Sequence, residues 1–222
     1  MKVVLLNTSS RTGGAAVAAA RLLRALRKQG VSVQMCVLHK EREEDWIETV
    51  EKGRCSHLLN RIRFYWERAV IFLHNHFNRS QLFRVSIANT GTDISRLPCV
   101  READVIHLHW INQGFLSLND IKQLAALGKP IVWTMHDMWS YTGVCHYASD
   151  CQSFHQMCGS CFYLDSHADK DLSTQIYQKK QQIYKKADLS FVGCSNWIAA
   201  LAKKSGLLRG KRDTKDYGKD LL

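Results

Sequence analysis

The chain has 222 residues and a mass of 25.4 kDa, enough for one well-buried α/β domain but not for two full domains of roughly 150–200 residues each. Its 45% apolar and 23% charged residues, with only two prolines, exclude wholesale disorder and a fibrous repeat. The formal net charge of +11 is uneven, at +8 over residues 1–103, −4 over 104–169 and +7 over 170–222.

Positive charge therefore flanks an acidic middle third, which holds the unusual residues described below. A nucleic-acid interface gathers positive charge at the site itself, so a function in binding DNA or RNA is disfavoured. Attraction to an anionic membrane surface or to a phosphorylated substrate agrees equally well with the charge distribution.

The sequence predicts a cytoplasmic protein. It has no run of about 18 apolar residues, and the apolar run from Val3 to Leu6 is too short for a signal peptide. A peripheral position at the inner face of the plasma membrane is compatible with this location. The eight cysteines are then expected to be free thiols or metal ligands and not disulfides.

The first forty residues predict a β-α-β unit. Residues 2–6 form a nearly continuous apolar run, which is typical of a buried parallel strand. After a polar loop, the segment from Ala15 to Gln29 is rich in Ala, Leu and Arg and predicts a helix, which Gly30 ends. Residues 31–38 alternate as a second strand.

Two helices are expected between residues 41 and 103. The first is a charged helix over residues 41–50. The second, over residues 58–77, has apolar residues at close to helical spacing, namely Leu59, Ile62, Trp66, Val70 and Leu73. We expect this apolar face to pack on the sheet while the opposite face, with Arg61, Arg63 and Arg68, lies in solvent. The alternative is that the basic face contacts anionic lipid head groups.

The α/β alternation returns at residue 104. Strands are predicted over residues 104–109, 131–135 and 189–192, and helices over 117–127, over 172–186 and from 195 onward. A cysteine-rich loop, residues 138–168, interrupts the alternation. Strands separated by helices predict a doubly wound parallel sheet, Rossmann-like, with right-handed crossovers.

Ligands of such a sheet bind outside the carboxyl ends of its strands, so the residues that follow each strand are the candidates. After the first strand, Gly13 and Gly14 precede the N-terminus of a helix, where free N–H groups and the helix dipole favour a phosphate. The spacing is neither the dinucleotide-binding G-x-G-x-x-G motif nor a P-loop, and a simple tight turn is the alternative.

Two histidine-containing segments follow neighbouring core strands. His109 and Trp110 end one strand, and His136 and Asp137 end the next. Imidazole donates to hydroxyls or phosphates, and an indole such as that of Trp110 or Trp139 offers a stacking face for a sugar ring. We expect these residues in the site; the alternative for each histidine is a structural role in the core.

Four cysteines lie close together in the cysteine-rich loop, Cys145, Cys151, Cys158 and Cys161. They end on a C-x2-C knuckle, and four thiolates suffice for a tetrahedral structural zinc with no open position for catalysis. Zinc would stabilise a long loop that otherwise lacks a core. The alternatives are reduced thiols that pack the loop, and disulfide or redox chemistry.

Four segments of the chain carry the motifs of a known family. They are Asp104-Val-Ile-His-Leu-His-Trp110, Trp133-Thr-Met-His-Asp-Met-Trp139, Gly143-Val-Cys-His-Tyr147 and Gly193-Cys-Ser-Asn-Trp197. Together they resemble the N-terminal half of family-four GT-B glycosyltransferases of bacterial capsule, exopolysaccharide and O-antigen assembly. The resemblance covers residues 2–209. It implies a retaining enzyme whose N-terminal domain, residues 1–209, receives the acceptor sugar while a second Rossmann-like domain binds the nucleotide-sugar donor.

The resemblance also implies roles for individual residues. Gly13 and Gly14 match the glycine loop beneath the donor phosphates, His136 matches the histidine near the transferred sugar, and Asp137 matches its neighbour in the cleft. No catalytic metal is implied, so positioning and stabilisation of the phosphate leaving group supply most of the catalysis. The implied partners are a nucleotide sugar and a glycan or lipid-linked sugar acceptor.

The chain departs from the family at its C-terminal end. The donor-side glutamate pair, E-x7-E, belongs to the second domain, and we interpret the matching spacing of Glu43 and Glu51 as chance because both precede the site. Residues 210–222 are polar, lack periodicity and are expected to be a disordered tail. We therefore expect an acceptor-side domain without its donor domain, inactive in isolation, either truncated or completed by a separate chain.

Two other functions remain open at this stage. The net charge and the four cysteines agree with a zinc-containing nucleic-acid-binding protein, although the acidic middle third argues against it. The second alternative is a non-catalytic, truncated partner subunit.

Overall fold

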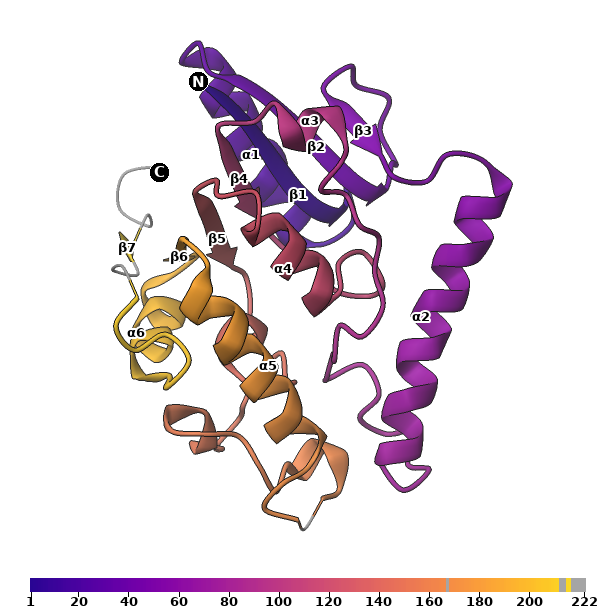
Figure 1. The fold of residues 1–222 in the computed structure, drawn as a ribbon, viewed down its shortest axis with the longest axis vertical. Coiled ribbons are helices and arrows are strands. Elements are labelled where there is room, and N and C mark those ends of the chain that lie inside the picture. The colour runs from indigo at the N-terminus through magenta and orange to yellow at the C-terminus, as the bar shows by residue number, and fades with distance from the viewer. Residues whose placement is uncertain (167, 212–214, 217–222) are drawn as a thin grey trace.

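The computed structural model describes residues 1–166, 168–211 and 215–216 (Figure 1). In chain order the elements are β1 (Lys2–Ser9), α1 (Gly14–Lys28), β2 (Ser32–His39), β3 (Ile47–Thr49), α2 (Arg54–His74), α3 (Pro98–Arg101), β4 (Val105–Leu108), α4 (Leu118–Ala125), β5 (Ile131–Met135), α5 (Leu172–Lys186), β6 (Leu189–Gly193), α6 (Asn196–Lys204) and β7 (Lys215–Asp216). The cysteine-rich loop contains three short 3-10 helices, η1 (Trp139–Tyr141), η2 (Ser153–His155) and η3 (Phe162–Leu164).

The described strands form one sheet in the order β3-β2-β1-β4-β5-β6-β7, and neighbouring strands are parallel. From β1 the chain first builds outward to β2 and β3 and then returns to the other side of β1 with β4. The topological switch point therefore lies between β1 and β4. This order confirms the predicted doubly wound, Rossmann-like fold.

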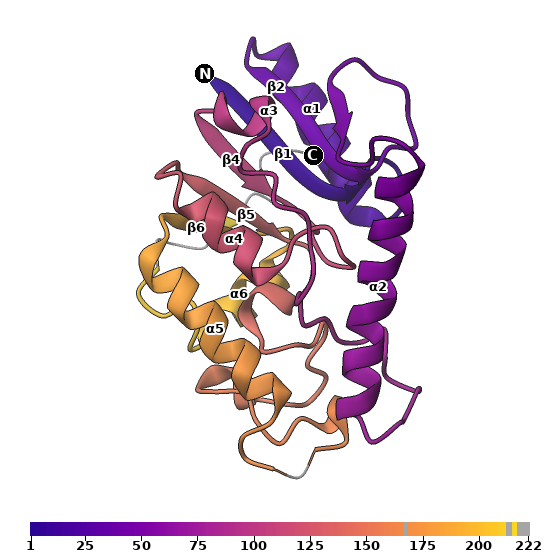
Figure 2. The same cartoon turned by 45° about the vertical axis from the view of Figure 1, so that its right-hand side comes forward.

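The two faces of the sheet bury separate sets of side chains. On β1, Val4 and Leu6 belong to a large core that includes residues of α4 and α5, whereas Val3 and Leu5 belong to a smaller core with α1. Figure 2 shows α4 and α5 together on one face of the sheet. A strand covered on both faces has no polar side, which explains the continuous apolar run at the N-terminus.

Several predicted elements are confirmed closely. The strand at 131–135 and the helix at 172–186 have the predicted bounds. α4 begins after Ser117, whose hydroxyl accepts the backbone N–H of Asp120, while the carboxylate of Asp120 accepts the backbone N–H of Ser117. This capping box satisfies the free N–H groups at the start of the helix.

The helix predicted over residues 41–50 is wrong. Residues 47–49 form β3 instead, because they pair with β2 at the edge of the sheet. Before β3, the carboxylate of Glu41 accepts the backbone N–H groups of Arg11 and Thr12 at 3.1 and 3.0 Å. These contacts with distant residues outweigh the local helical preference of the charged segment.

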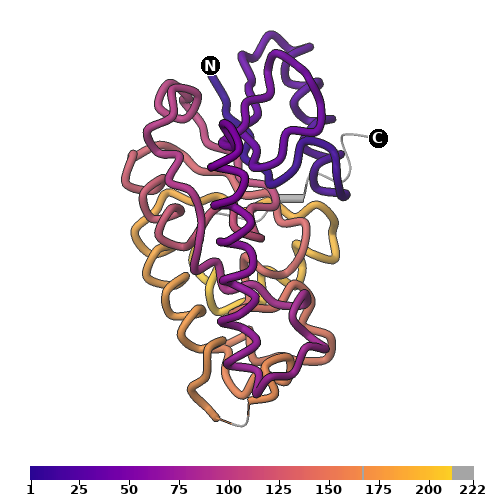
Figure 3. The backbone as a smooth tube through the Cα atoms, turned by 90° about the vertical axis from the view of Figure 1, so that its right-hand side faces the viewer, coloured from indigo at the N-terminus to yellow at the C-terminus, as the bar shows by residue number. Residues whose placement is uncertain are grey.

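The predicted helix at 58–77 is present as α2, but its packing is the reverse of the expected one. Leu59, Ile62, Trp66 and Leu73 are exposed, whereas Arg68 is buried. The reason is that Glu67 and Arg68 lie on the inward face of α2 and form hydrogen bonds with backbone groups of residues 82–88. Figure 3 shows α2 running along the outside of the molecule.

A buried lysine anchors the start of the cysteine-rich loop. Lys180 of α5 is fully buried, and its Nζ donates to the carbonyls of Trp139, Thr142 and Gly143 at 2.5–3.1 Å. Burial lowers the pKa of Lys180 to about 7. Only the charged ammonium has three N–H groups for three carbonyls, so these contacts favour the protonated form.

Most of the tail predicted to be disordered, residues 210–222, lies outside the described residues. Within it, Lys215–Asp216 form β7, which pairs with β6.

The end of β6 lies too close to α6 for a side chain at residue 193. A Cβ placed on Gly193 would lie 2.8 Å from the Cβ and the backbone N of Ala199. We predict that Gly193→Ala lowers the free energy of unfolding by about 1–3 kcal/mol, measured by urea denaturation. The control is Gly14→Ala, because a Cβ there meets no atom within 4 Å. Equal effects of the two substitutions would contradict the prediction.

Candidate active site

The loops after β1 and β4 are joined at the carboxyl edge of the sheet. The Thr8 hydroxyl lies 3.0 Å from the carbonyl oxygens of both Trp110 and Asn112, which share its one hydrogen. The side-chain oxygen of Asn7 accepts the backbone N–H of Trp110 at 2.9 Å. These bonds fix the backbone that follows β4 at the topological switch point, where open α/β sheets bind ligands.

Three histidine rings form a row across β4 and β5. The ring centroids of His107 and His109 are 4.5 Å apart, and those of His109 and His136 are 5.2 Å apart. Nδ1 of His109 lies 2.9 Å from Nε2 of His136, so one ring donates to the other. Nε2 of His109 is buried and has no hydrogen-bond partner among the described residues. The structure thus brings together the two histidines that the sequence predicts in the site.

Burial favours the neutral form of all three histidines. Burial, with a smaller contribution from His136, lowers the pKa of His107 to about 4. Burial and the two neighbouring histidines hold the pKa of His109 well below its usual value. Burial also lowers the pKa of His136, against the opposing effect of the Asp137 carboxylate. Each neutral ring has one N–H donor and one acceptor nitrogen.

Asp137 connects three segments around the histidines. Its Oδ2 accepts the indole N–H of Trp110 at 2.9 Å and lies 2.7 Å from Nδ1 of His146, and its Oδ1 accepts the backbone N–H of Trp139 at 2.9 Å. Burial raises the pKa of Asp137, but His146 and the other donors outweigh burial, so the pKa lies below its usual value. Because protein groups bind both carboxylate oxygens, this geometry favours a positioning role for Asp137.

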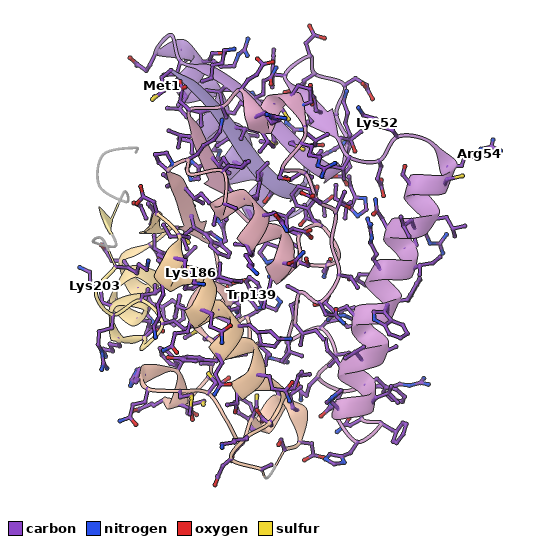
Figure 4. All side chains as sticks on the ribbon, viewed as in Figure 1. Met1, Lys52, Arg54, Trp139, Lys186 and Lys203 are labelled. Carbon is purple, nitrogen blue, oxygen red and sulfur yellow. The ribbon has the colours of Figure 1, made fainter. Side chains whose placement is uncertain are left out.

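The cavity below these residues is too small for a sugar. It is lined by residues that include His109, His136 and Asp137, and its volume of about 10 Å³ is that of a single water molecule. Trp139 also lines it, but is 1% exposed and donates its indole N–H to the carbonyl of Ser86 at 2.8 Å. Figure 4 shows Trp139 near the middle of the molecule, beside α5. The structure therefore places Trp139 behind the site, while Trp110 remains partly exposed.

The glycine loop lies on the same edge, between β1 and α1. Gly13 has a φ of +91°, which favours glycine, and a Cβ on either Gly13 or Gly14 would meet no atom within 4 Å. The neighbouring N–H of Thr12 already binds a carboxylate, that of Glu41, at 3.0 Å. Hydrogen bonds from Ser9 and Thr12 lower the pKa of Glu41 to about 2. The loop before α1 thus binds one anion and leaves open space at the glycines.

A larger pocket of about 380 Å³ contains two aromatic residues that sequence reasoning did not select. Tyr147 and Trp197 line it with Asp150 and His155. Both aromatic side chains are more than half exposed, and their ring centroids lie 6.4 Å apart. Each of these residues ends one of the four sequence motifs. Their contact depends on the packing of the cysteine-rich loop beside α6, which the motifs do not predict.

The structure does not support the predicted zinc site. Within residues 1–166, 168–211 and 215–216, no group of three or more His, Cys, Asp or Glu is placed to hold a metal ion. Cys145, Cys151, Cys158 and Cys161 are free thiols, and Sγ of Cys158 accepts the backbone N–H of Gly143 at 3.2 Å. Burial raises the pKa of both Cys158 and Cys161 to about 12. Protonated thiols that pack the loop fit these contacts better than thiolate ligands.

The fold is a Rossmann-like domain with a hydrogen-bonded histidine pair at the carboxyl edge of β4 and β5, next to its switch point. The model of Glycosyltransferase Family 4 matches residues 12–211, and the chain belongs to this family. This confirms the family that the motifs predict.

Two comparisons with individual proteins give further context. The chain is 24% identical over 205 residues to the "Putative colanic acid biosynthesis glycosyl transferase WcaC" of Escherichia coli (strain K12), a match that covers 87% of this chain and 47% of that protein. The chain thus spans about half the length of this relative. A solved short-chain dehydrogenase/reductase superfamily protein from Agrobacterium tumefaciens with bound NAD has a TM-score of 0.37 and 12% identity, covering 86% of this chain and 48% of that one. That likeness is too weak to support an inference.

The histidine row predicts a pH dependence of stability. The pKa of His107 is about 4 in the folded protein and about 6.5 in the unfolded chain. Between about pH 4 and pH 6.5, His107 therefore binds a proton more readily in the unfolded chain. The free energy of unfolding should therefore fall as the pH is lowered from about 6.5 to 4. His107→Gln should reduce this slope by up to about 1.4 kcal/mol per pH unit, measured by urea denaturation at several pH values. An unchanged slope would contradict the assignment.

Proposed function

We propose that the chain is the acceptor-side lobe of a retaining glycosyltransferase, which transfers a sugar from a nucleotide-sugar donor to a growing glycan or a lipid-linked acceptor. The observation that carries the proposal is the hydrogen-bonded pair of His109 and His136 at the carboxyl edge of β4 and β5, in a chain of Glycosyltransferase Family 4. The proposal uses no metal in any step, so it does not depend on a metal site, and the described residues contain no group of three or more side chains placed to hold one.

His136 is proposed as the residue that contacts the transferred sugar. A buried N–H without a partner is rarer than a buried lone pair without one, so we place the proton of His109 on Nδ1 and leave its buried Nε2 unprotonated. His109 then donates to Nε2 of His136, and His136 carries its own proton on Nδ1. This N–H is available to a sugar hydroxyl or a phosphate oxygen, and the His109 bond fixes the orientation of the ring.

The glycine loop is proposed to stabilise the leaving group. Breaking the bond from sugar to phosphate places negative charge on the nucleotide. Backbone N–H groups at Gly13 and Gly14, at the N-terminus of the 15-residue α1, are oriented to stabilise an anion. Most donor contacts are proposed to come from a second lobe, outside these 222 residues or on a separate chain.

The pocket of Tyr147 and Trp197 is the proposed site of the acceptor. Its volume of about 380 Å³ accommodates a sugar, which the cavity beneath the histidines does not. Exposed aromatic rings stack on sugar rings, and the carboxylate of Asp150 can accept from sugar hydroxyls. By analogy with the name of the Escherichia coli relative, we propose an acceptor of exopolysaccharide assembly. A cytoplasmic location, peripheral at the inner face of the plasma membrane, suits a lipid-linked acceptor.

We predict that His136→Ala lowers kcat by about 10²–10³-fold, as expected for loss of a hydrogen bond that strengthens in the transition state. The assay measures radiolabelled sugar transfer from a panel of nucleotide sugars to lipid-linked acceptors. It uses the chain fused to the donor-side half of the Escherichia coli relative.

Two controls accompany this assay. Lys186→Ala, an exposed change at the end of α5, should leave transfer unchanged. The 222-residue chain alone should show no turnover. Full activity of the His136→Ala fusion, or nucleotide-sugar turnover by the chain alone, would contradict the proposal.

A further inference from the structure

α2 is an amphipathic helix whose apolar side faces solvent. Leu58, Ile62, Tyr65, Trp66 and Leu73 are each between 56% and 59% exposed. Their spacing of three, four or seven residues places them on one side of a helix. The stripe runs from Leu58 to Leu73 of α2, so at about 1.5 Å per residue it extends for roughly 22 Å.

The opposite side of α2 is polar and buried, which fixes the orientation of the helix. Oε1 of Glu67 accepts the backbone N–H groups of Ile87 and Ala88, at 2.8 Å each. Arg68 forms an ion pair with Glu67 at 2.8 Å and donates to the carbonyl of Val85 at 3.0 Å. Turning the apolar stripe inward would break these buried bonds and leave their donors and acceptors unpaired.

The charge around the stripe is almost entirely positive. Residues 52–84 contain seven Lys or Arg and a single acidic residue, Glu67, which is buried. Arg54 and Arg61 are exposed beside the stripe. Figure 4 shows Lys52 and Arg54 at the N-terminal end of α2, with Arg54 directed away from the body of the molecule.

Two further aromatic side chains are exposed beyond the end of α2, Phe77 at 66% and Phe83 at 65%. Tyr and Trp side chains within the stripe have a polar atom on an apolar ring, which suits the boundary between lipid head groups and acyl chains. Exposed apolar and aromatic side chains bordered by arginine are typical of helices that lie in the plane of a membrane surface.

We infer that α2 binds an anionic phospholipid membrane, with its apolar stripe inserted at the head-group boundary and its arginines on the lipid phosphates. No helix in the described part of the chain is long and apolar enough to cross a membrane, so the proposed contact is with one surface. The sequence alone allowed a lipid contact through the basic face of this helix, with its apolar face packed on the sheet. In the structure the apolar face is the one that faces solvent.

This surface is directly connected to the carboxyl edge of the sheet. Gly114, in the loop after β4, lies against the backbone of α2, since a Cβ there would be 3.5 Å from the N of Phe64. Arg63 of α2 donates to the hydroxyl of Thr92 at 2.6 Å. Binding through α2 would therefore hold the loop after β4 near the membrane. The inference goes beyond the proposed sugar transfer and does not depend on it.

The test is co-sedimentation of the 222-residue chain with vesicles of phosphatidylcholine alone and of phosphatidylcholine with phosphatidylglycerol. We expect binding to the anionic vesicles and weaker binding to the neutral ones. The double substitution Ile62→Glu with Trp66→Glu should reduce the partition coefficient about tenfold or more, because it removes apolar contact and adds negative charge. The matched control is Met157→Glu, which changes a side chain of 49% exposure in the cysteine-rich loop and should bind as the wild type.

Several outcomes would overturn the inference. They are failure of the wild type to bind anionic vesicles, equal binding to neutral vesicles, and equal binding by the double variant. A concentration-dependent dimer that the double variant abolishes, without vesicle binding, would assign the stripe to a second copy of the chain. Urea denaturation of each variant checks that it folds. Because no sugar is present in the assay, failure here would leave the proposed sugar transfer standing.

Discussion

The hydrogen bonds of the Asp137 carboxylate, a side chain that is 13% exposed, are the interaction on which the carboxyl edge of this sheet depends. The carboxylate accepts N–H groups from Trp110 after β4, from Trp139 after β5, and from His146 in the cysteine-rich loop. His146 continues the network to the hydroxyl of Ser86, 3.0 Å from its Nε2. Because a buried donor without an acceptor costs about 1–3 kcal/mol, this network holds the three segments in a single arrangement. The hydrogen-bonded histidine pair lies within that arrangement.

The fold and the centre of the site could be predicted because they depend on local patterns and on one topological rule. Apolar runs with intervening helices predict parallel strands, and parallel strands end at a common edge. The meeting of His109 with His136 follows from that edge. The pocket of Tyr147 and Trp197 could not be predicted, because these residues are 50 positions apart and meet only through the packing of the cysteine-rich loop and α6.

The errors of prediction have a common physical cause. Periodicity predicts that α2 has an apolar side, but contacts with distant residues decide which side faces the protein. Here the buried bonds of Glu67 and Arg68 with residues 82–88 direct the apolar stripe outward. The segment at 41–50 likewise follows its pairing with β2 and the contacts of Glu41, and the cysteine spacing does not produce a metal site among the described residues. In the proposed function, the outward stripe would bring the chain to the membrane that holds a lipid-linked acceptor.

The most direct test of this account is a double-mutant cycle between Asp137 and His146, followed by urea denaturation. The account predicts that Asp137→Ala lowers the free energy of unfolding by about 3 kcal/mol, because it leaves buried donors unpaired. The two single substitutions should be non-additive by about 1 kcal/mol or more. Additive effects, or a loss below about 0.5 kcal/mol for Asp137→Ala, would contradict the claim that this carboxylate organises the site.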